Sequence, residues 1–152
     1  MDIYDIFNNQ RYHHEDEVVE FKKAEHNFDF DDLGKYFSAL SNEANLRDKP
    51  FAWMAFGVHD NTREIIGTSF KNSLKSLQKL KQDLSQHTTD NNTFREIFEL
   101  AIDGKRVLLF QIPAAPRGIP VAWHGHFYGR RGESLVALDG TERPCGVEQK
   151  AD

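Results

Sequence analysis

FAWMAFGV, at residues 51–58, is a nearly unbroken apolar run that leads directly into the turn residues Asp60 and Asn61. A run of this length suits a strand, and the lack of apolar–polar alternation indicates a strand with both faces buried. Turn chemistry at residues 60–62 and the β-branched pair at residues 65–66 predict a short partner strand at residues 65–67. The stretch therefore predicts a strand in the core of a sheet-containing domain.

Upstream of this run, the chain predicts a strand and a long helix. Residues 18–22, VVEFK, combine β-branched and aromatic residues between polar flanks, which is typical of a strand. Carboxylates at residues 29–32 favour a helix start, and apolar residues follow at helical spacing: Leu33, Phe37, Leu40 and Ala44. The charged loop at residues 46–50 ends that helix, and residues 1–12 allow a further short helix.

Downstream, leucines at positions 74, 77, 80 and 84 predict an amphipathic helix. Residues 93–102 and 105–112 predict two strands joined by the hairpin turn Asp103-Gly104, and residues 121–128 and 134–138 predict two more strands. We therefore expect an α/β (α+β) fold, with a mixed sheet of about six strands and two main helices packed on it. The expected domain covers residues 1–138, and the polar, aperiodic residues 139–152 are expected to form a flexible tail.

Length and composition bound the class of protein. The 152 residues suit a single domain, and 39% hydrophobic and 28% charged residues are typical of a chain that folds. No stretch approaches the apolar length of a membrane span, and the first residues lack a secretory pattern. The lone Cys145 excludes an internal disulfide and fits a reducing compartment. We expect a cytoplasmic protein.

The charge of the chain is unevenly distributed. The formal net charge of −5 argues against a protein that coats nucleic acid by bulk charge. Residues 104–132, however, contain none of the 24 acidic residues and five of the 19 basic ones: Lys105, Arg106, Arg117, Arg130 and Arg131. This segment predicts either a local basic face or a chance cluster on a solvated edge.

The second half of that segment carries aromatic and basic residues in alternation. A strand through residues 121–128 would place Trp123 and Phe127 on one side, and His124, His126, Tyr128 and Arg130 on the other. Histidine, tyrosine and arginine side chains contact phosphates and stack on unpaired bases. We therefore expect a nucleic-acid contact at Arg117, His124, His126, Tyr128, Arg130 and Arg131. The alternative is a polar stripe that is merely exposed.

Three stretches together resemble the Schlafen/Alba-like DNA-binding domain family. The first is EDEVVEFK at residues 15–22, a Glu followed after four residues by Glu-Phe-Lys. The second is FSALSN at residues 37–42, followed by FGVHD at residues 56–60 and Ile66-Gly67. The third is Ile112-Pro113, then GIPV at residues 118–121 and HFYGRRGES at residues 126–134. One departure is that a charged loop at residues 45–50 replaces the Gly-Gly pair of typical members.

The resemblance implies a nucleic-acid-binding module, with DNA favoured over RNA, in a bacterial protein of the transcriptional-regulator, ATP-binding or helicase-related kind. Such modules are usually part of a longer multidomain chain. In Schlafen proteins that cleave structured RNA, the matching Glu, Glu and Asp form the catalytic set. Carried over to this sequence, these residues are Glu15, Glu20 and Asp60.

Converging carboxylates of this kind bind Mg²⁺ or Mn²⁺, which hold a phosphate and activate an attacking water. Lys22 follows Glu20 by two residues and so lies on the same strand face, where its ammonium could stabilise a transition state. The alternative is that Asp60 caps a turn and that Glu20 and Lys22 form a surface ion pair. Metal-dependent endoribonuclease activity is therefore the runner-up, ahead of a protein-interaction or assembly domain that forms a homodimer.

Two other activities find no support in the sequence. The His pairs at residues 13–14 and at positions 124 and 126 have only Cys145 as a thiol companion, which does not make a structural zinc site. The chain also lacks the phosphate-binding pattern GxxxxGK[ST], so we expect no helicase motor activity from this chain by itself.

Overall fold

The computed structural model describes residues 2–13, 17–131 and 134–138. The predicted tail at residues 139–152 and the predicted ligand Glu15 lie outside these residues. The helices are α1 (Ile3–Tyr12), α2 (Phe30–Leu46) and α3 (Leu74–Ser85), followed by a short 3-10 turn at Thr89–Asn91. The strands are β1 (Val19–Lys22), β2 (Phe51–Phe56), β3 (Glu96–Ile102), β4 (Lys105–Pro113), β5 (Ala122–Trp123), β6 (His126–Arg131) and β7 (Ser134–Leu138).

The strands form two sheets. The first has the order β1-β2-β4-β3, in which β1 and β2 are parallel and the other neighbours antiparallel. The second is the antiparallel sheet β5-β6-β7. The mixed α/β class is confirmed, but the expectation of one sheet of about six strands is wrong, because β5, β6 and β7 form a sheet separate from β1–β4 in the described part of the chain. None of the helices described is both long and apolar enough to span a membrane.

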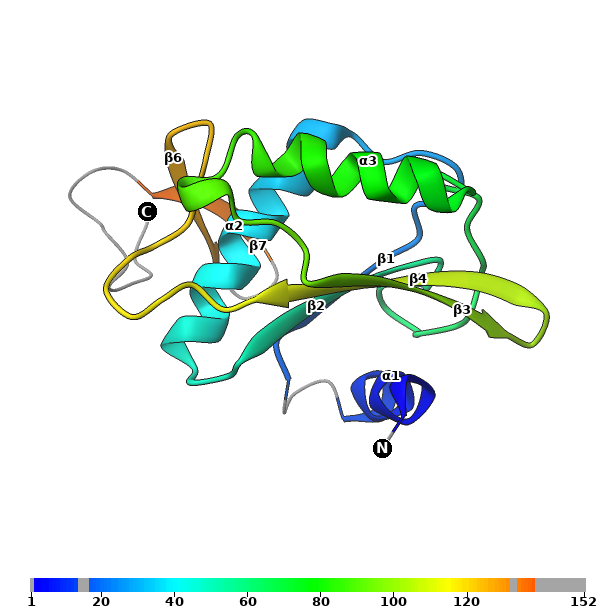
Figure 1. The fold of residues 1–152 in the computed structure, drawn as a ribbon. Helices are drawn as coiled ribbons and strands as arrows, with labels where there is room; N and C mark the ends of the chain where they lie inside the picture. Colours follow the sequence, from blue (N-terminus) through cyan, green and yellow to red (C-terminus); the bar gives the residue numbers. More distant parts are fainter. Residues whose placement is uncertain (1, 14–16, 132–133, 139–152) are drawn as a thin grey trace.

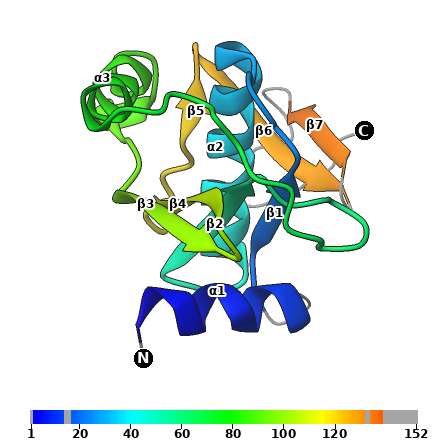
Figure 2. The same cartoon turned by 90° about the vertical axis from the view of Figure 1, so that its right-hand side faces the viewer.

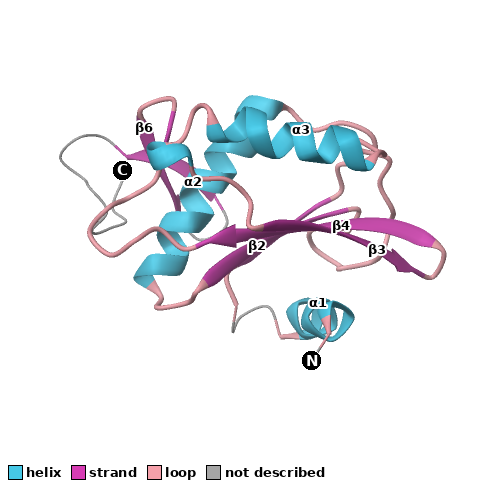
Figure 3. Cartoon of the chain, viewed as in Figure 1, coloured by secondary structure: helices cyan, strands magenta, loops and turns pink. Residues whose placement is uncertain are grey.

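Helices cover both faces of the four-stranded sheet (Figures 1 and 3). On one face, Met54 and Phe56 of β2 pack in an apolar cluster with residues of α2 and α3. On the other face, Trp53 and Ala55 pack in a second cluster that includes Phe7 of α1. The prediction of a strand buried on both faces is therefore confirmed for residues 51–56, and Val58 contributes only an isolated bridge to Ile65.

Helix α2 lies between the two sheets, and one of its faces receives β5 and β6 (Figure 2). Gly34 is needed there, because a Cβ at this position would lie 2.1 Å from the indole ring of Trp123. One turn further on, the Ser38 hydroxyl donates to the Val121 carbonyl at 2.8 Å and accepts from the Tyr128 N–H at 3.1 Å. Asn42 follows one turn after Ser38. Gly34, Ser38 and Asn42 thus form a stripe on α2 that contacts the second sheet.

Residues 121–128 do not form the single strand that their alternation predicts. His124 and Gly125 adopt positive φ values of 51° and 80°, which is the geometry of a two-residue hairpin turn. The chain reverses there, and Trp123 pairs with His126 on β6. His124 lies in the turn and does not continue the predicted stripe, which is reduced to His126, Tyr128 and Arg130 at alternate positions of β6. The predicted strand at residues 65–67 is likewise reduced to one bridge between Val58 and Ile65.

Asn42 offers a direct test of how the second sheet is attached. Its side chain accepts from the Val121 N–H at 2.8 Å and donates to the carbonyls of Val121 and Tyr128 at 3.1 Å each. Asn42→Ala removes all three bonds and leaves the buried Val121 N–H without this acceptor, although Ser38 still donates to the Val121 carbonyl. We expect a loss of about 2–3 kcal/mol in unfolding free energy, measured by urea denaturation. Asn45→Ala on the same helix is the control and should change stability by less than about 0.5 kcal/mol. Equal losses in both variants would show that the Asn42 contacts do not hold the sheet.

Candidate nucleic-acid interface

Two exposed histidine rings stack where the β5–β6 turn meets the end of α3. The rings of His87 and His124 have centroids 4.2 Å apart and an interplanar angle of 20°. The His124 N–H donates to the His87 carbonyl at 2.9 Å, which fixes the two backbones together. The indole of Trp123, only 1% exposed, contacts both rings edge-on. We name this feature the histidine pair; it presents flat aromatic surface on a rigid support.

The support extends to the first turns of α2. The Trp123 indole N–H donates to the Asp31 carboxylate at 2.7 Å, and the Lys35 ammonium lies 3.3 Å from the same carboxylate. The indole hydrogen bond lowers the pKa of Asp31, and Lys35 adds to this effect against partial burial. The hydrogen bond to Asp31 and the nearby Tyr128 raise the pKa of Lys35. Lys35 therefore keeps its positive charge beside the Tyr128 ring, 5.9 Å from its centroid.

A groove of about 620 Å³ runs between the β1–α2 loop and the start of α3. We name it the α3 groove. Its polar lining includes His26, Asn27, Lys71, Asn72, Ser73 and Lys79, and its aromatic lining includes Phe28, Phe30 and Phe70. Phe30 also contacts Trp123 and His87 edge-on, with centroids 5.3 and 6.4 Å apart. The groove and the histidine pair therefore adjoin through Phe30.

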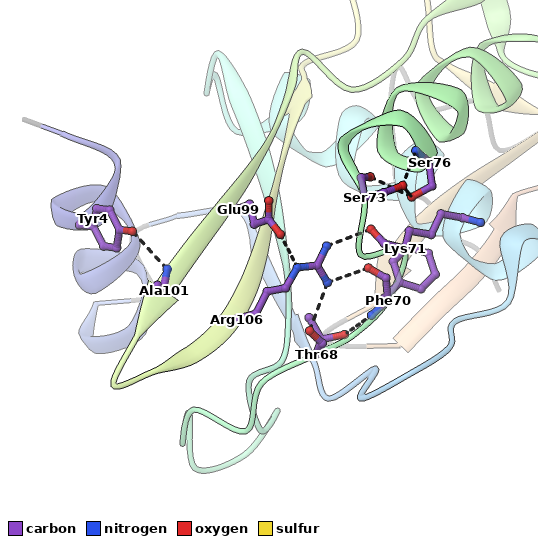
Figure 4. A network of polar contacts seen from close by, with 9 residues as sticks. All are labelled: Tyr4, Thr68, Phe70, Lys71, Ser73, Ser76, Glu99, Ala101 and Arg106. Atoms are coloured by element: carbon purple, nitrogen blue, oxygen red, sulfur yellow. Dashed lines mark hydrogen bonds and ion pairs between the residues drawn. The ribbon is translucent and has the colours of Figure 1, made fainter.

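One wall of the α3 groove is fixed by Arg106 of β4 (Figure 4). Its guanidinium donates to the carbonyls of Thr68, Phe70 and Lys71 at 2.8 to 3.1 Å and pairs with Glu99 of β3. These bonds hold the segment before α3 against the sheet, and the Ser73 side chain then caps α3 by accepting from the Ser76 N–H. The groove is therefore formed before any ligand arrives.

The acid-free segment at residues 104–132 does not form one basic face in the part of the chain that the structure describes. Arg106 is bound to Glu99, the Lys105 ammonium donates to the Ile65 carbonyl, and exposed Arg117 lies 3.6 Å from Asp48. Of the two readings of this segment, the chance cluster is favoured. The cations beside the histidine pair and the α3 groove come from elsewhere in the chain, namely Lys35, Lys71 and Lys79.

The predicted contact residues have separate environments. His124 and His126 are exposed, whereas Tyr128 is half-buried against the core that α2 covers. The Arg130 side chain is only 8% exposed, and its guanidinium pairs with Glu20 and Glu43 at 2.6 Å each. Burial opposes its charge, but the two carboxylates outweigh this effect and raise the pKa of Arg130. Arg130 therefore joins β6 to β1 and α2.

Arg131 belongs to β6 by its backbone pairing with Ser134, and its side chain lies outside the described residues. Sequence reasoning missed Lys35, Lys71 and His87. Lys35 has a usable signal, because it lies four residues after Asp31 on the same helix face. No sequence pattern indicates that His87 meets His124, because only the turn at residues 124–125 brings them together.

Glu20 and Asp60 line one small cavity of about 20 Å³, together with Arg63 and Arg130. The Glu20 carboxylate already has two cationic neighbours, Arg130 at 2.6 Å and Lys22 at 3.6 Å. Burial lowers the pKa of Lys22, but Tyr36 and Glu20 together outweigh burial and raise it. Glu20 and Asp60 therefore line the same small cavity, in which the Arg130 guanidinium already pairs with the buried Glu20 carboxylate.

Three acidic residues cluster elsewhere in the described chain, at the start of α2: Asp29, Asp31 and Asp32. The Asp29 carboxylate accepts from the Asp32 N–H at 3.0 Å as the helix cap, and Asp31 binds Trp123. These bonds account for the cluster as a helix start and an anchor for the indole.

The lowered pKa of Asp31 gives a pH-dependent test of the Trp123 anchor. An ionised Asp31 stabilises the fold at neutral pH, and this contribution is lost as pH falls through its folded-state pKa, below the ordinary value of 3.8. Asp31→Asn keeps an oxygen for the indole and removes the charge. We expect it to unfold at lower urea concentration at pH 7, with a difference that closes below about pH 4. Asp103→Asn, in the β3–β4 turn, is the control, and a gap for Asp31→Asn that is constant with pH would contradict the assignment.

Comparison with known proteins finds one matching family model and solved structures of similar fold. A family model described as Schlafen, AlbA_2 matches residues 15–139. The DIP2311 protein of Corynebacterium diphtheriae has a similar fold, with a TM-score of 0.57 and 19% identity, over 81% of this chain and 22% of that one. This chain thus spans about a fifth of the length of that protein. A search of curated proteins found no significant match.

The second similar structure is the N-terminal domain of a protein from Nitrosomonas europaea, named as related to the ATP-dependent DNA helicase RecG. Its TM-score is 0.53 with 16% identity, and the match covers 97% of this chain and 95% of that domain. Both likenesses show a shared fold. Because the family model also spans most of the sequence, from the strand before α2 to the end of β7, the chain belongs to the Schlafen, AlbA_2 family.

Proposed function

We propose that this chain is a nucleic-acid-binding module that binds a single strand, DNA in preference to RNA, across the histidine pair and the α3 groove. Membership in the Schlafen, AlbA_2 family supports a function connected with nucleic acid. The name of the Nitrosomonas europaea protein refers to DNA and to a helicase, which supports DNA and a place in a longer, helicase-related or regulatory protein. Residues 1–138 are the proposed domain.

The adjacency of flat exposed rings and a preformed groove carries this proposal. His87 and His124 offer ring faces on which the unpaired bases of a strand can stack. Phe30 links these rings to the groove, where Lys71 has no acidic partner among the described residues and can pair with a phosphate. Bases paired in a duplex would not reach the rings. The arrangement therefore favours a single strand.

The balance of charge sets the strength of binding. The chain carries a net charge of −5, and Lys79 in the groove is paired with Asp83 at 3.2 Å. Only a few phosphate contacts are available, so we expect micromolar affinity or weaker in physiological salt and a shallow salt dependence.

The test is binding of fluorescently labelled single-stranded DNA, the matching duplex and single-stranded RNA, measured by anisotropy. His124→Ala removes a stacking ring, and we expect affinity to fall about fivefold or more. Lys71→Ala should weaken binding and reduce the salt slope, because it removes a phosphate contact. Lys75→Ala is the matched control, since this exposed lysine lies in the first turn of α3, four residues after Lys71, but does not line the groove.

Equal affinities for the parent, His124→Ala and Lys71→Ala would exclude this surface as the contact. Arg130 is unsuitable for such a test, because Arg130→Glu would add a carboxylate between Glu20 and Glu43 and disturb the fold. If no nucleic acid binds at all, the assembly role is favoured, and the mass of the chain in solution then tests for the homodimer.

Metal-dependent endoribonuclease activity is the second candidate, because Glu20 and Asp60 line one cavity and Lys22 adjoins it. Arg130 weighs against it, since a Mg²⁺ or Mn²⁺ ion at Glu20 would have to replace or share the space of the guanidinium. We therefore rank cleavage below binding.

Incubation with transfer RNA in Mg²⁺ or Mn²⁺ tests this ranking, with gel analysis of the products. We expect intact RNA with and without metal. Discrete cuts that need metal, that disappear with Glu20→Gln and that persist with the control Asp103→Asn would reverse the ranking of the two functions.

A further inference from the structure

Helix α1 covers the face of the four-stranded sheet that is turned away from α2 and α3, and specific hydrogen bonds fix it there (Figures 1 and 2). Arg11 near its end donates twice to the Arg63 carbonyl, at 3.0 and 3.2 Å. Near its start, the Tyr4 hydroxyl accepts from the Ala101 N–H of β3 at 3.1 Å, as Figure 4 shows. Phe7 is fully buried between these two anchors. Helix α1 is therefore an integral layer of the fold.

The side chain of Gln10 on α1 is buried and makes no hydrogen bond within the described residues. Its side chain is 1% exposed, and neither its amide oxygen nor its amide nitrogen has a partner among the described residues. The other buried neutral polar side chains, those of Ser38, Ser41, Asn42 and Thr68, are all hydrogen-bonded. A buried amide with four unused hydrogen-bonding positions is costly, so its retention calls for an occupant that satisfies it.

A cavity of about 320 Å³ adjoins this amide, and we name it the α1 cavity. Ile6, Asn9 and Gln10 line it from α1, and Phe51 and Trp53 line it from β2. The two aromatic rings meet edge-on, with centroids 6.1 Å apart, and Lys49 stands at the start of β2. The lining thus combines aromatic and aliphatic side chains with Gln10 and the charged residues Glu17 and Lys49.

We propose that the α1 cavity binds a nucleobase ring. A primary amide matches the edge of a base, because it donates and accepts side by side in one plane, as glutamine does toward adenine. Aromatic and aliphatic side chains suit the faces of a flat ring. The volume is at the lower end of the range of small-molecule sites, which fits a single base better than a larger ligand. An aliphatic occupant would leave the amide unpaired.

The base can come from a free nucleoside or from an unpaired residue of a strand. The α1 cavity and the α3 groove lie on opposite faces of the sheet, so this proposal does not depend on the proposed function. Variants in one site leave the other intact, and the two proposals can therefore fail separately.

Adenosine, guanosine, cytidine and thymidine are the probes, each added at up to millimolar concentration to the whole chain. We expect at least one to raise the Tm and to shift the NMR signals of the Gln10 side-chain amide. A short single strand that contains the best base forms the second arm. A response to the strand alone identifies its unpaired base as the source.

Gln10→Met removes the unpaired amide and keeps the length of the side chain. We expect it to raise the Tm of the ligand-free protein by about 2 °C or more and to abolish the nucleoside response. Gln78→Met, at an exposed position on α3, is the control and should keep the response. Lys71→Ala and His124→Ala should also keep it, which separates this site from the α3 groove.

Two outcomes would overturn the proposal. One is that no nucleoside and no strand changes the Tm or the Gln10 signals, which would mean that water alone fills the cavity. The other is that Gln10→Met responds to the nucleoside as the parent does. If Gln10→Met fails to fold, Gln10→Glu supplies the same test, because it loses the amide donors and should lose the response to a base that needs them.

Discussion

The close contact between Trp123 and Gly34 determines how the second sheet, β5-β6-β7, packs on α2. The indole occupies the space that the Cβ atom of any residue other than glycine at position 34 would need. The second sheet therefore packs directly against the backbone of α2 at this point. Ser38 and Asn42 continue the same face and form hydrogen bonds with the backbones of Val121, just before β5, and Tyr128 of β6. A small residue and two polar residues, spaced by four, thus replace the apolar stripe that usually joins a helix to a sheet.

The candidate interface is a consequence of that contact. Trp123 supports the histidine pair, binds Asp31, and through Asp31 positions Lys35. Phe30, at the start of the same helix, joins this cluster to the α3 groove. A chain with a net charge of −5 can therefore present aromatic and cationic groups together without a broadly basic surface. Under the proposed function, stacking and shape, rather than bulk charge, supply most of the affinity.

The two sides of the four-stranded sheet serve different proposed sites. On the side covered by α2 and α3, polar residues line an open groove. On the α1 side, Gln10 lies near the aromatic residues of β2. Glu20 and Arg130 form a third polar centre, which bridges β1 to β6 and α2. The ion pair makes structural use of a carboxylate that the family resemblance assigns to catalysis, and this is the physical reason for ranking binding above cleavage.

The sequence by itself determined the helices, the four strands of the main sheet and the mixed α/β class, because apolar periodicity and turn residues act locally. It also predicted a grouping of Glu15, Glu20, Asp60 and Lys22, which stays a prediction; of these, Glu20 and Asp60 line one small cavity and Lys22 lies 3.6 Å from Glu20. Only the tertiary structure decided the reversal at His124 and Gly125, the pairing of Arg130 with Glu20 and Glu43, and the unpaired amide of Gln10. Each of these depends on partners far away in the chain, and a local pattern carries no information about which distant side chain will occupy the space beside it.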